Sequence, residues 1–279
     1  TMNVPIGNGE WSQGSPPSMP SQRLAKLIHA VEDFTSTECS HLKILDLGCL
    51  EGAHAIEFAL RGADVLGIEG REQNLAKCMY AKERLGLNNL KFRLGDVTKL
   101  SVAETGVFDV VNLSGLLYHI SAADQGPLLQ FCADATRRLL IIDTHISVES
   151  KHSFEYMGDS YSGRDDREHS ERDGRRQKEN RPWASLENNV SFWITKPSLV
   201  NLLGRLGFGS VYETLLPAMP PLVQPELKDR TTLCGIKRSP ASVAGTTFES
   251  PPWSECDLAG RSDLLQRIQN DAFIVAASD

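Results

Sequence analysis

Acidic residues and glycines follow three short apolar runs of this sequence. The first run leads into Asp46-Leu-Gly-Cys-Leu-Glu-Gly52, the second ends at Glu69 and the third is followed by Asp96. Glycine lets a backbone approach a ligand where a Cβ would collide. A carboxylate such as Glu69 accepts two hydrogen bonds from a ribose diol, and one such as Asp96 can meet the exocyclic amine of an adenine. These residues therefore predict a site for a ligand that contains a nucleoside.

Two histidines follow later apolar runs and are the candidate general bases. His119 stands in Leu-Leu-Tyr-His-Ile, and His145 stands in Asp-Thr-His-Ile. A general base contributes typically 10²–10⁴-fold when the acceptor is an oxygen of high pKa, whereas a neutral amine or a carboxylate needs none. The alternative for His119 is packing at a helix start, and the alternative for His145 is a polar strand end shared with Asp143. Nothing in the spacing fixes a ligand geometry for a metal, so no metal is predicted.

Residues 148–195 break the regularity of the chain, and we predict that this insertion is a lid over the acceptor, because long insertions in compact domains are often lids. The candidate acceptor contacts are Tyr118, His152, Tyr156 and Trp193.

Two alternatives remain for parts of this insertion. The mixed charges from Arg164 to Arg181 are typical of a solvated or disordered loop. The tryptophans at 183 and 193 can anchor the returning chain to the core instead of stacking on an acceptor.

The elements that must position these residues alternate along the chain. Short apolar runs predict strands at 43–47, 64–68, 90–94, 108–113 and 139–143. Helical spacing of apolar residues predicts helices at 53–61, 73–85 and 127–136 between them. Strands that alternate with helices predict an α/β fold with a parallel sheet and right-handed crossovers. In such a sheet, ligands bind outside the carboxyl ends of the strands, where the polar residues above are found.

The order of these motifs resembles that of the class I S-adenosylmethionine-dependent methyltransferases. Leu-Asp-Leu-Gly-Cys-x-Glu-Gly, Gly-Ile-Glu, Leu-Gly-Asp-Val and Phe-Asp-Val-Val follow one another between about residues 40 and 145. The resemblance implies a Rossmann-like, seven-stranded, mostly parallel sheet with helices on both faces and one antiparallel closing strand. The runs 211–216 and 231–236 are suited to complete that sheet. It also implies S-adenosylmethionine as cofactor, with S-adenosylhomocysteine as product.

The resemblance further assigns roles to matching positions. Residues of the first loop would surround the methionine portion, Glu69 would hold the ribose, Asp96 and Val97 would frame the adenine, and Leu113 and Ser114 would line the floor. The cofactor-binding residues that it implies are Asp46, Gly48, Cys49, Gly52, Glu69, Gly70, Asp96, Val97, Leu113 and Ser114.

The insertion is similar to that of a bacterial branch related to the tRNA wobble-uridine modifying methyltransferases. The similarity is carried by Tyr-x-Gly, a charged stretch, Trp, Ser-Phe-Trp and a Leu-rich segment, in that order. Members of that branch mostly act on unidentified or natural-product acceptors. We therefore expect methyl transfer to a small molecule, at an oxygen of a natural product or a sugar-like metabolite, with His145 or His119 as base.

Three other functions are compatible with parts of the sequence. An RNA nucleoside methyltransferase is favoured only by the arginines between 164 and 181, whose acidic neighbours nearly cancel them. A binding protein without catalysis is suggested by Leu50, which stands where the family usually has its middle glycine. A nicotinamide-dependent reductase is disfavoured, because Gly48-Cys-Leu-Glu-Gly52 does not have the spacing of G-x-G-x-x-G.

Composition sets the remaining expectations. The 279 residues include 29 Lys and Arg against 36 Asp and Glu, a net charge of −7, which argues against a general nucleic-acid binder. No apolar run approaches the roughly 18 residues of a membrane span, no signal segment is apparent, and the six cysteines form no C-x-x-C pair. We expect a cytoplasmic, bacterial protein with reduced thiols. Its expected parts are an irregular arm (1–20), the methyltransferase domain (21–238) and a C-terminal extension (239–279). The sequence does not indicate an oligomeric state.

Overall fold

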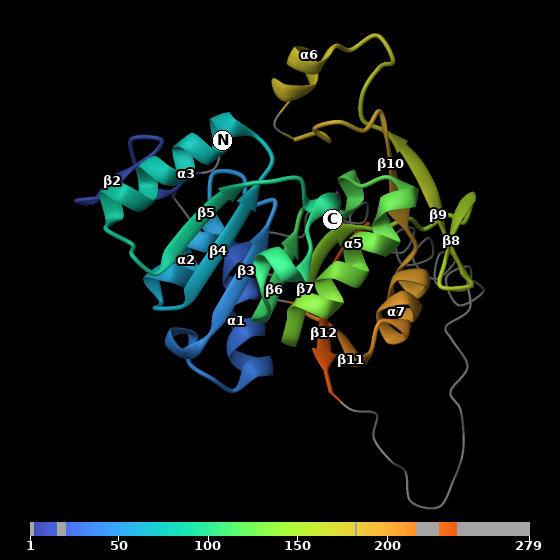
Figure 1. The fold of residues 1–279 in the computed structure, drawn as a ribbon, viewed down its shortest axis with the longest axis horizontal. Helices are drawn as coiled ribbons and strands as arrows, with labels where there is room; N and C mark the ends of the chain where they lie inside the picture. Colours follow the sequence, from blue (N-terminus) through green and yellow to red (C-terminus); the bar gives the residue numbers. More distant parts are fainter. Residues whose placement is uncertain (1–2, 16–20, 182, 216–228, 239–279) are drawn as a thin grey trace, which may run out of the picture.

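A seven-stranded sheet forms the centre of the computed structural model, which describes residues 3–15, 21–181, 183–215 and 229–238 (Figure 1). The strand order is β11-β12-β7-β6-β3-β4-β5, and β12 runs antiparallel to both of its neighbours while the other pairs are parallel. The strands are β3 (Lys43–Leu47), β4 (Asp64–Glu69), β5 (Leu90–Leu94), β6 (Phe108–Ser114), β7 (Thr136–His145), β11 (Phe208–Glu213) and β12 (Arg230–Lys237). This arrangement confirms the predicted fold class and its antiparallel closing strand.

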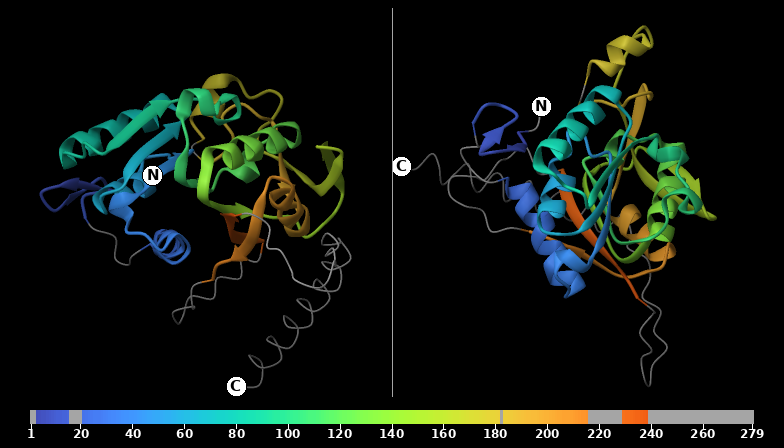
Figure 2. Two further views of the ribbon diagram at one scale, coloured as in Figure 1. Left: turned by 60° about the horizontal axis from the view of Figure 1, so that its bottom comes forward. Right: turned by 60° about the vertical axis from the view of Figure 1, so that its left-hand side comes forward.

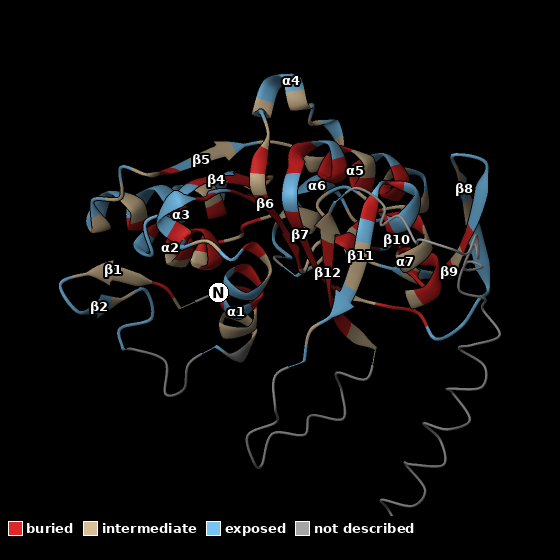
Figure 3. Ribbon diagram, turned by 90° about the horizontal axis from the view of Figure 1, so that it is seen from below, coloured by how far each residue is buried: buried red, intermediate tan, exposed pale blue. Residues whose placement is uncertain are grey.

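Helices cover both faces of the sheet. On one face, α1 (Gln22–Thr35), α2 (Ala53–Leu60) and α3 (Glu72–Leu85) pack on the strands, and on the other α5 (Ala122–Ala135) and α7 (Lys196–Arg205) do so. The central strands are therefore buried on both sides, as their continuous apolar runs predict (Figure 3). The remaining short helical elements are η1 (Cys39–His41), η2 (Val97–Lys99), α4 (Val102–Thr105) and η3 (Leu117–His119).

Helix α5 begins five residues before the predicted start at Pro127. Ser121 is its N-cap, because the Ser121 hydroxyl accepts a hydrogen bond from the N–H of Asp124 at 3.3 Å. The proline lies inside the helix, where its ring removes one backbone donor. The capping sequence Ser121-Ala-Ala-Asp124, and not Pro127, therefore determines where the helix begins.

The insertion forms a second, three-stranded antiparallel sheet of order β10-β9-β8 beside the main sheet (Figure 1). Its elements are β8 (His152–Tyr156), β9 (Asp159–Arg167), α6 (Arg175–Glu179) and β10 (Val190–Ile194). Tyr161 and Phe192 are buried in the same hydrophobic cluster as α5 and α7. The interpretation of residues 164–181 as a disordered loop is therefore wrong for residues 164–167, which are part of β9.

The arm at the start of the chain is not wholly irregular. Residues 3–15 contain a short hairpin, β1 (Pro5–Gly7) and β2 (Glu10–Trp11), that lies against α3 (Figures 1 and 2). Arg84 of α3 holds it by donating to the carbonyl of Ile6 and by pairing with Glu10. The C-terminal extension (239–279) and the helix predicted within it at 258–275 lie outside the described residues.

Two further expectations bear on the described part of the chain. The five cysteines within it are free and buried. No helix there combines the length and the apolar character that crossing a membrane requires.

Candidate active site

A cavity of about 600 Å³ opens at the carboxyl ends of β3, β4, β5 and β6. Its walls come from the loop after β3, from the ends of β4 and β5, from Arg23 of α1 and from residues 183–188 of the insertion. The predicted site residues that line it are Gly48, Cys49, Glu69, Gly70, Asp96, Val97, Ser114, Tyr118 and His119. The sheet thus brings together residues that are separated by up to 71 positions in the sequence.

The loop after β3 owes its path to three residues with positive φ. Gly48, Leu50 and Gly52 have φ values of 65°, 51° and 84°. A Cβ at Gly52 would meet the ring of Phe92 at 2.9 Å, so glycine is required there by contact as well as by φ. Leu50 is strained in this region but lines the cavity, and its N–H and carbonyl are both bonded within the site.

Glu69 is the buried carboxylate at the end of β4. Its Oε2 accepts the N–H of Leu50 at 2.8 Å, and its Oε1 accepts the N–H of Arg71 at 2.9 Å and the amide of Asn74 at 3.2 Å. Burial raises the pKa of Glu69 above its usual range even though these donors favour the charged form. The carboxylate is therefore fixed in position at the cavity wall, with one lone pair of Oε2 left for a ligand hydroxyl.

Asp46 lies behind the cavity wall, at the end of β3. Its Oδ1 accepts the amide of Asn112 at 2.7 Å, and Asn112 in turn accepts the hydroxyl of Ser114 at 2.6 Å. Its Oδ2 is buried without a hydrogen-bond partner in the described part of the chain. Burial raises the pKa of Asp46 to about 7, although the bond from Asn112 opposes this shift. Gly52 and Leu113 likewise do not line the cavity, so their predicted cofactor roles stay predictions.

Asp96 caps the short helix η2. Its Oδ1 accepts the N–H and the hydroxyl of Thr98, and its Oδ2 pairs with Lys99 at 2.8 Å. Burial would raise its pKa, but these partners outweigh burial and hold the pKa below its usual value. Asp96 therefore caps η2 and also lines the cavity.

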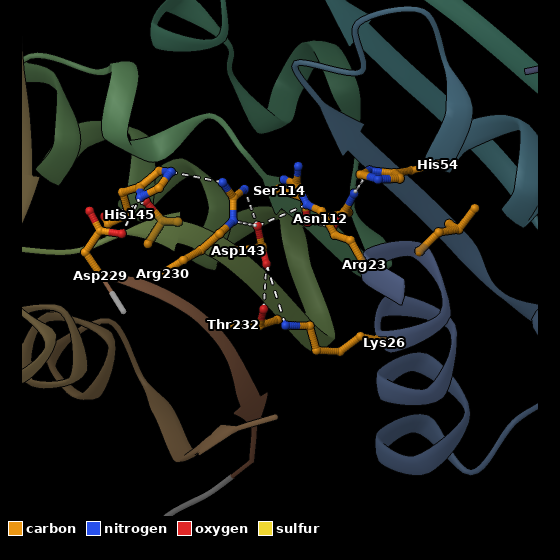
Figure 4. A network of polar contacts seen from close by, with 12 residues as sticks. Arg23, Lys26, His54, Asn112, Ser114, Asp143, His145, Asp229, Arg230 and Thr232 are labelled. Carbon is orange, nitrogen blue, oxygen red and sulfur yellow. Dashed lines mark hydrogen bonds and ion pairs between the residues drawn. The ribbon is translucent and has the colours of Figure 1, made fainter. Parts of the chain in front are cut away.

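Asp143 at the end of β7 is the centre of a charged network that sequence reasoning missed (Figure 4). The buried carboxylate contacts Arg230 at 2.5 Å, Arg23 at 3.0 Å and Lys26 at 4.0 Å, and it accepts the hydroxyl of Thr232 at 2.6 Å. Burial would raise the pKa of Asp143, but the two guanidinium groups lower it below its usual value. Three cations around one carboxylate leave a local excess of positive charge.

Arg23 is the cation of this network that lines the cavity. Its Nη2 is buried without a hydrogen-bond partner among the described residues. Burial lowers its pKa, while Asp143 and, more weakly, Asp46 raise it. An unpartnered guanidinium nitrogen on the cavity wall and an unpartnered carboxylate oxygen of Asp46 behind that wall thus belong to two groups that interact electrostatically. The carboxylate and ammonium of an amino acid would satisfy both.

His145 is held within this network and does not line the cavity. Arg230 Nη1 donates to His145 Nε2 at 3.1 Å, so the proton of the neutral ring is on Nδ1, which lies 3.0 Å from Asp229 Oδ1 (Figure 4). The ring stacks on Trp193 at 4.9 Å and meets Tyr118 edge-on at 4.7 Å. With its one lone pair engaged, His145 is poorly arranged to take a proton.

His119, on η3, has the arrangement that a general base requires. The Nδ1 of His119 lies 2.6 Å from Oε1 of Glu168, and His119 lines the cavity. A carboxylate only accepts, so Nδ1 carries the proton of the neutral ring and Nε2 keeps the lone pair. Burial would raise the pKa of Glu168, but His119 outweighs burial and holds the pKa below its usual value.

The other predicted acceptor contacts lie away from the cavity. His152 is exposed on β8 and pairs with Asp165, while the ring of Tyr156 packs against Gly126 of α5. Both faces of the Trp193 indole are occupied, by Arg164 at 4.2 Å and by His145. Of the four candidates, only Tyr118 lines the cavity. Within the described residues, no group of three His, Cys, Asp or Glu side chains is arranged to hold a metal ion.

Comparison with known proteins agrees with this geometry. Residues 38–159 match a family model described as a methyltransferase domain. The O-antigen chain terminator bifunctional methyltransferase/kinase WbdD of Escherichia coli is 28% identical over 141 residues, 49% of this chain and 20% of that protein. The ubiquinone biosynthesis O-methyltransferase of Acinetobacter baumannii (strain AYE) is 33% identical over 90 residues, 32% of this chain and 37% of that protein. The chain thus spans between a fifth and two fifths of these curated relatives.

Solved structures also resemble most of the chain. The N-terminal domain of EvdMO1, crystallised in the presence of S-adenosylhomocysteine and D-fucose, superposes with a TM-score of 0.60 and is 27% identical. The match covers 81% of this chain and 85% of that one. The strand order, the loop after β3 and the family match agree, and the chain therefore contains a class I, S-adenosylmethionine-dependent methyltransferase domain.

Proposed function

We propose that this protein transfers the methyl group of S-adenosylmethionine to a hydroxyl of a small-molecule acceptor, with His119 as general base. The observation that carries the proposal is a pair of charged groups that each have an unsatisfied buried atom, Arg23 Nη2 on the cavity wall and Asp46 Oδ2 behind it. A buried cation and a buried anion without hydrogen bonds are costly unless a ligand completes them. The amino-acid end of S-adenosylmethionine carries both complementary charges.

The remaining cavity residues fit the rest of the cofactor. Glu69 Oε2 is available to a ribose hydroxyl, and Asp96 and Val97, which line the cavity, would border the adenine. When bound, the cofactor supplies an electrophilic methyl group on its sulfonium. The protein's own part is to orient the acceptor and to exclude water, effects worth on the order of 7–11 kcal/mol in favourable cases.

His119 would act on the acceptor hydroxyl. Its Nε2 holds the lone pair because Nδ1–H is bonded to Glu168, so Nε2 takes the hydroxyl proton as the oxygen attacks. His54, the other cavity histidine, is unsuited to proton transfer near neutral pH because burial lowers its pKa to about 3. Tyr118 would border the acceptor beside His119.

The surface charges favour a small acceptor over RNA. Three of the six arginines of the insertion that contributed to the RNA hypothesis are paired: Arg164 with Asp166, Arg175 with Glu179 and Arg181 with Asp173. Binding to phosphates requires clustered cations that are free to release counterions. A sugar-like acceptor is supported by the presence of D-fucose in the EvdMO1 crystals.

The test is calorimetry with S-adenosylhomocysteine, followed by assays of its release from S-adenosylmethionine with a panel of hydroxylated sugars that includes D-fucose. We expect binding to the wild type and release that depends on the acceptor. Binding without release by any member of the panel would contradict the sugar-like acceptor, and the absence of binding would contradict the whole proposal.

A further inference from the structure

We propose that Glu168 is a positioning residue for His119 and that the insertion delivers it to the site. The inference rests on the proposed function, because it concerns the general base of the same reaction. His119 belongs to the main domain, whereas Glu168 directly follows strand β9 of the insertion. The two side chains meet at 2.6 Å although 49 positions separate them in the sequence.

The Glu168 carboxylate is itself held in place. Its Oε2 accepts the backbone N–H of Ser185 at 3.1 Å, and its own backbone N–H donates to the carbonyl of Asn189 at 2.9 Å. The side chain is 7% exposed. A fixed carboxylate can only accept, so it selects the tautomer of His119 with the proton on Nδ1 and the lone pair on Nε2.

The insertion also fixes the backbone on which His119 sits. Asn188 donates its side-chain amide to the carbonyl of His119 at 3.2 Å. The buried amide of Gln125 donates to the carbonyls of Leu117, on the same short helix, and of Phe192, on β10. The ring and the main chain of His119 are thus both positioned by residues 168–192.

The same part of the insertion is hydrogen-bonded next to Glu69, the carboxylate that is predicted to hold the ribose. Arg71 donates through its guanidinium to the carbonyls of Arg181 and Ala184, and through its backbone N–H to Glu69. Inside the segment, the buried His169 donates from Nε2 to the carbonyl of Ser185. The described residues 168–181 and 183–188 therefore contribute Arg175 and residues 183–188 to the cavity wall and supply the carboxylate that orients the base.

The first test reads the tautomers of the histidine rings by long-range nitrogen–proton NMR in the full chain with labelled histidine. A His119→Gln variant assigns the His119 signals. In the wild type we expect His119 with its proton on Nδ1, and His169 with its proton on Nε2 as an internal contrast. In Glu168→Gln the amide can donate to Nδ1, so we expect a mixture or the opposite tautomer for His119 only.

The matched control is Glu171→Gln, because Glu171 is exposed in the same segment. It should leave every histidine signal unchanged. An Nε2–H tautomer for His119 in the wild type, or an unchanged His119 in a folded Glu168→Gln protein, would overturn the inference. Neither result depends on turnover, so the failure of this inference is distinguishable from the failure of the proposed function.

The second test separates positioning from a structural role. Using the first sugar acceptor that supports turnover, Glu168→Gln should lower kcat by about 10- to 100-fold, part of the 10²–10⁴ that a general base contributes. The affinity for S-adenosylhomocysteine should stay within about twofold. Glu168→Asp should recover part of kcat.

If Glu168→Gln lost the affinity for S-adenosylhomocysteine as much as it lost turnover, Glu168 would be a structural residue and the inference would be wrong.

Discussion

The N–H of Leu50 donates to Oε2 of Glu69 at 2.8 Å, and this bond ties the loop after β3 to the carboxylate at the end of β4. The bond depends on the backbone of residue 50 and not on its side chain. A leucine can therefore stand where related sequences have glycine, provided that the fold supports a φ of 51°.

That conformation gives a prediction for the stability of residue 50 variants. A left-handed φ costs a non-glycine residue roughly 1–2 kcal/mol, and glycine adds a comparable entropic cost of about 0.5–1 kcal/mol. We expect Leu50→Gly to change the free energy of unfolding by less than about 1 kcal/mol. Leu50→Val, which places a branched side chain at the same φ, should lower it by about 1–2 kcal/mol. Urea titrations followed by circular dichroism measure both, and a fully stable valine variant would argue against this backbone conformation.

Arg23 is expected to hold the carboxylate end of the cofactor. Its removal takes away a hydrogen bond to a charged group, worth about 1.5–3 kcal/mol, which corresponds to roughly a 10- to 100-fold loss of affinity. We expect Arg23→Met to weaken S-adenosylhomocysteine binding by that factor. Asp143 keeps Arg230 as its partner, so the variant should remain folded.

The matched control for Arg23 is Arg61→Met, since Arg61 is exposed, does not line the cavity and makes ion pairs only with Glu57 and Glu32 among the described residues. It should bind S-adenosylhomocysteine as the wild type does. Equal calorimetric titrations for the two variants would exclude the role given to Arg23.

The raised pKa of Asp46 predicts that the free energy of unfolding depends on pH. Its pKa is about 7 in the folded protein, above the value of about 3.9 in an unfolded chain, so the folded state binds the proton more tightly. The contribution of Asp46 to the free energy of unfolding of the ligand-free protein is therefore greatest below pH 4 and falls as the pH rises to about 7. Between these two pH values, the contribution of Asp46 to the free energy of unfolding changes by on the order of 4 kcal/mol.

The near-isosteric variant Asp46→Asn removes this titration. Its ligand-free form should gain more stability over the wild type at pH 8 than at pH 5, measured by thermal or urea unfolding at both pH values. Binding of S-adenosylhomocysteine should strengthen with pH between 6 and 8 in the wild type, because the ligand ammonium favours the ionised carboxylate. A variant with the same two pH profiles as the wild type would contradict the role of Asp46.

The two candidate bases are expected to differ sharply. His119→Ala should lower the turnover of a hydroxyl acceptor by about 10²–10⁴-fold. His145→Ala should lower it less than about tenfold, because His145 Nε2 is already bonded to Arg230 and its ring supports the aromatic cluster with Trp193. The exposed His29 on α1 provides the control variant, His29→Ala, which should be unaffected. A larger loss in His145→Ala than in His119→Ala would reverse this assignment.

The parts of the site that sequence reasoning predicts are those that follow directly from strand periodicity. Asp46, Glu69 and Asp96 each stand at or just after the end of a short run that predicts a strand, and parallel strands place their carboxyl ends at one edge. The positive φ at Gly48 and Gly52 likewise fits the residue type. Local pattern and sheet geometry were sufficient for these residues.

The groups that the sequence did not reveal are paired across long distances along the chain. Arg23 meets Asp143, and Glu168 meets His119, through tertiary packing that no local spacing encodes. The mixed-charge composition of residues 164–167 concealed a strand, because their side chains are mostly solvated while Tyr161 and Gly163 on the same strand pack inward. In α5, the capping serine at 121 outweighed the helix-breaking tendency of Pro127.

The most direct test of the account is isothermal calorimetry of S-adenosylhomocysteine with the full chain at pH 8, where Asp46 is mostly ionised. We expect saturable binding of one ligand per chain, weakened in Arg23→Met and unchanged in Arg61→Met. A folded wild-type sample that shows neither binding heat nor a ligand-induced rise in Tm would contradict it.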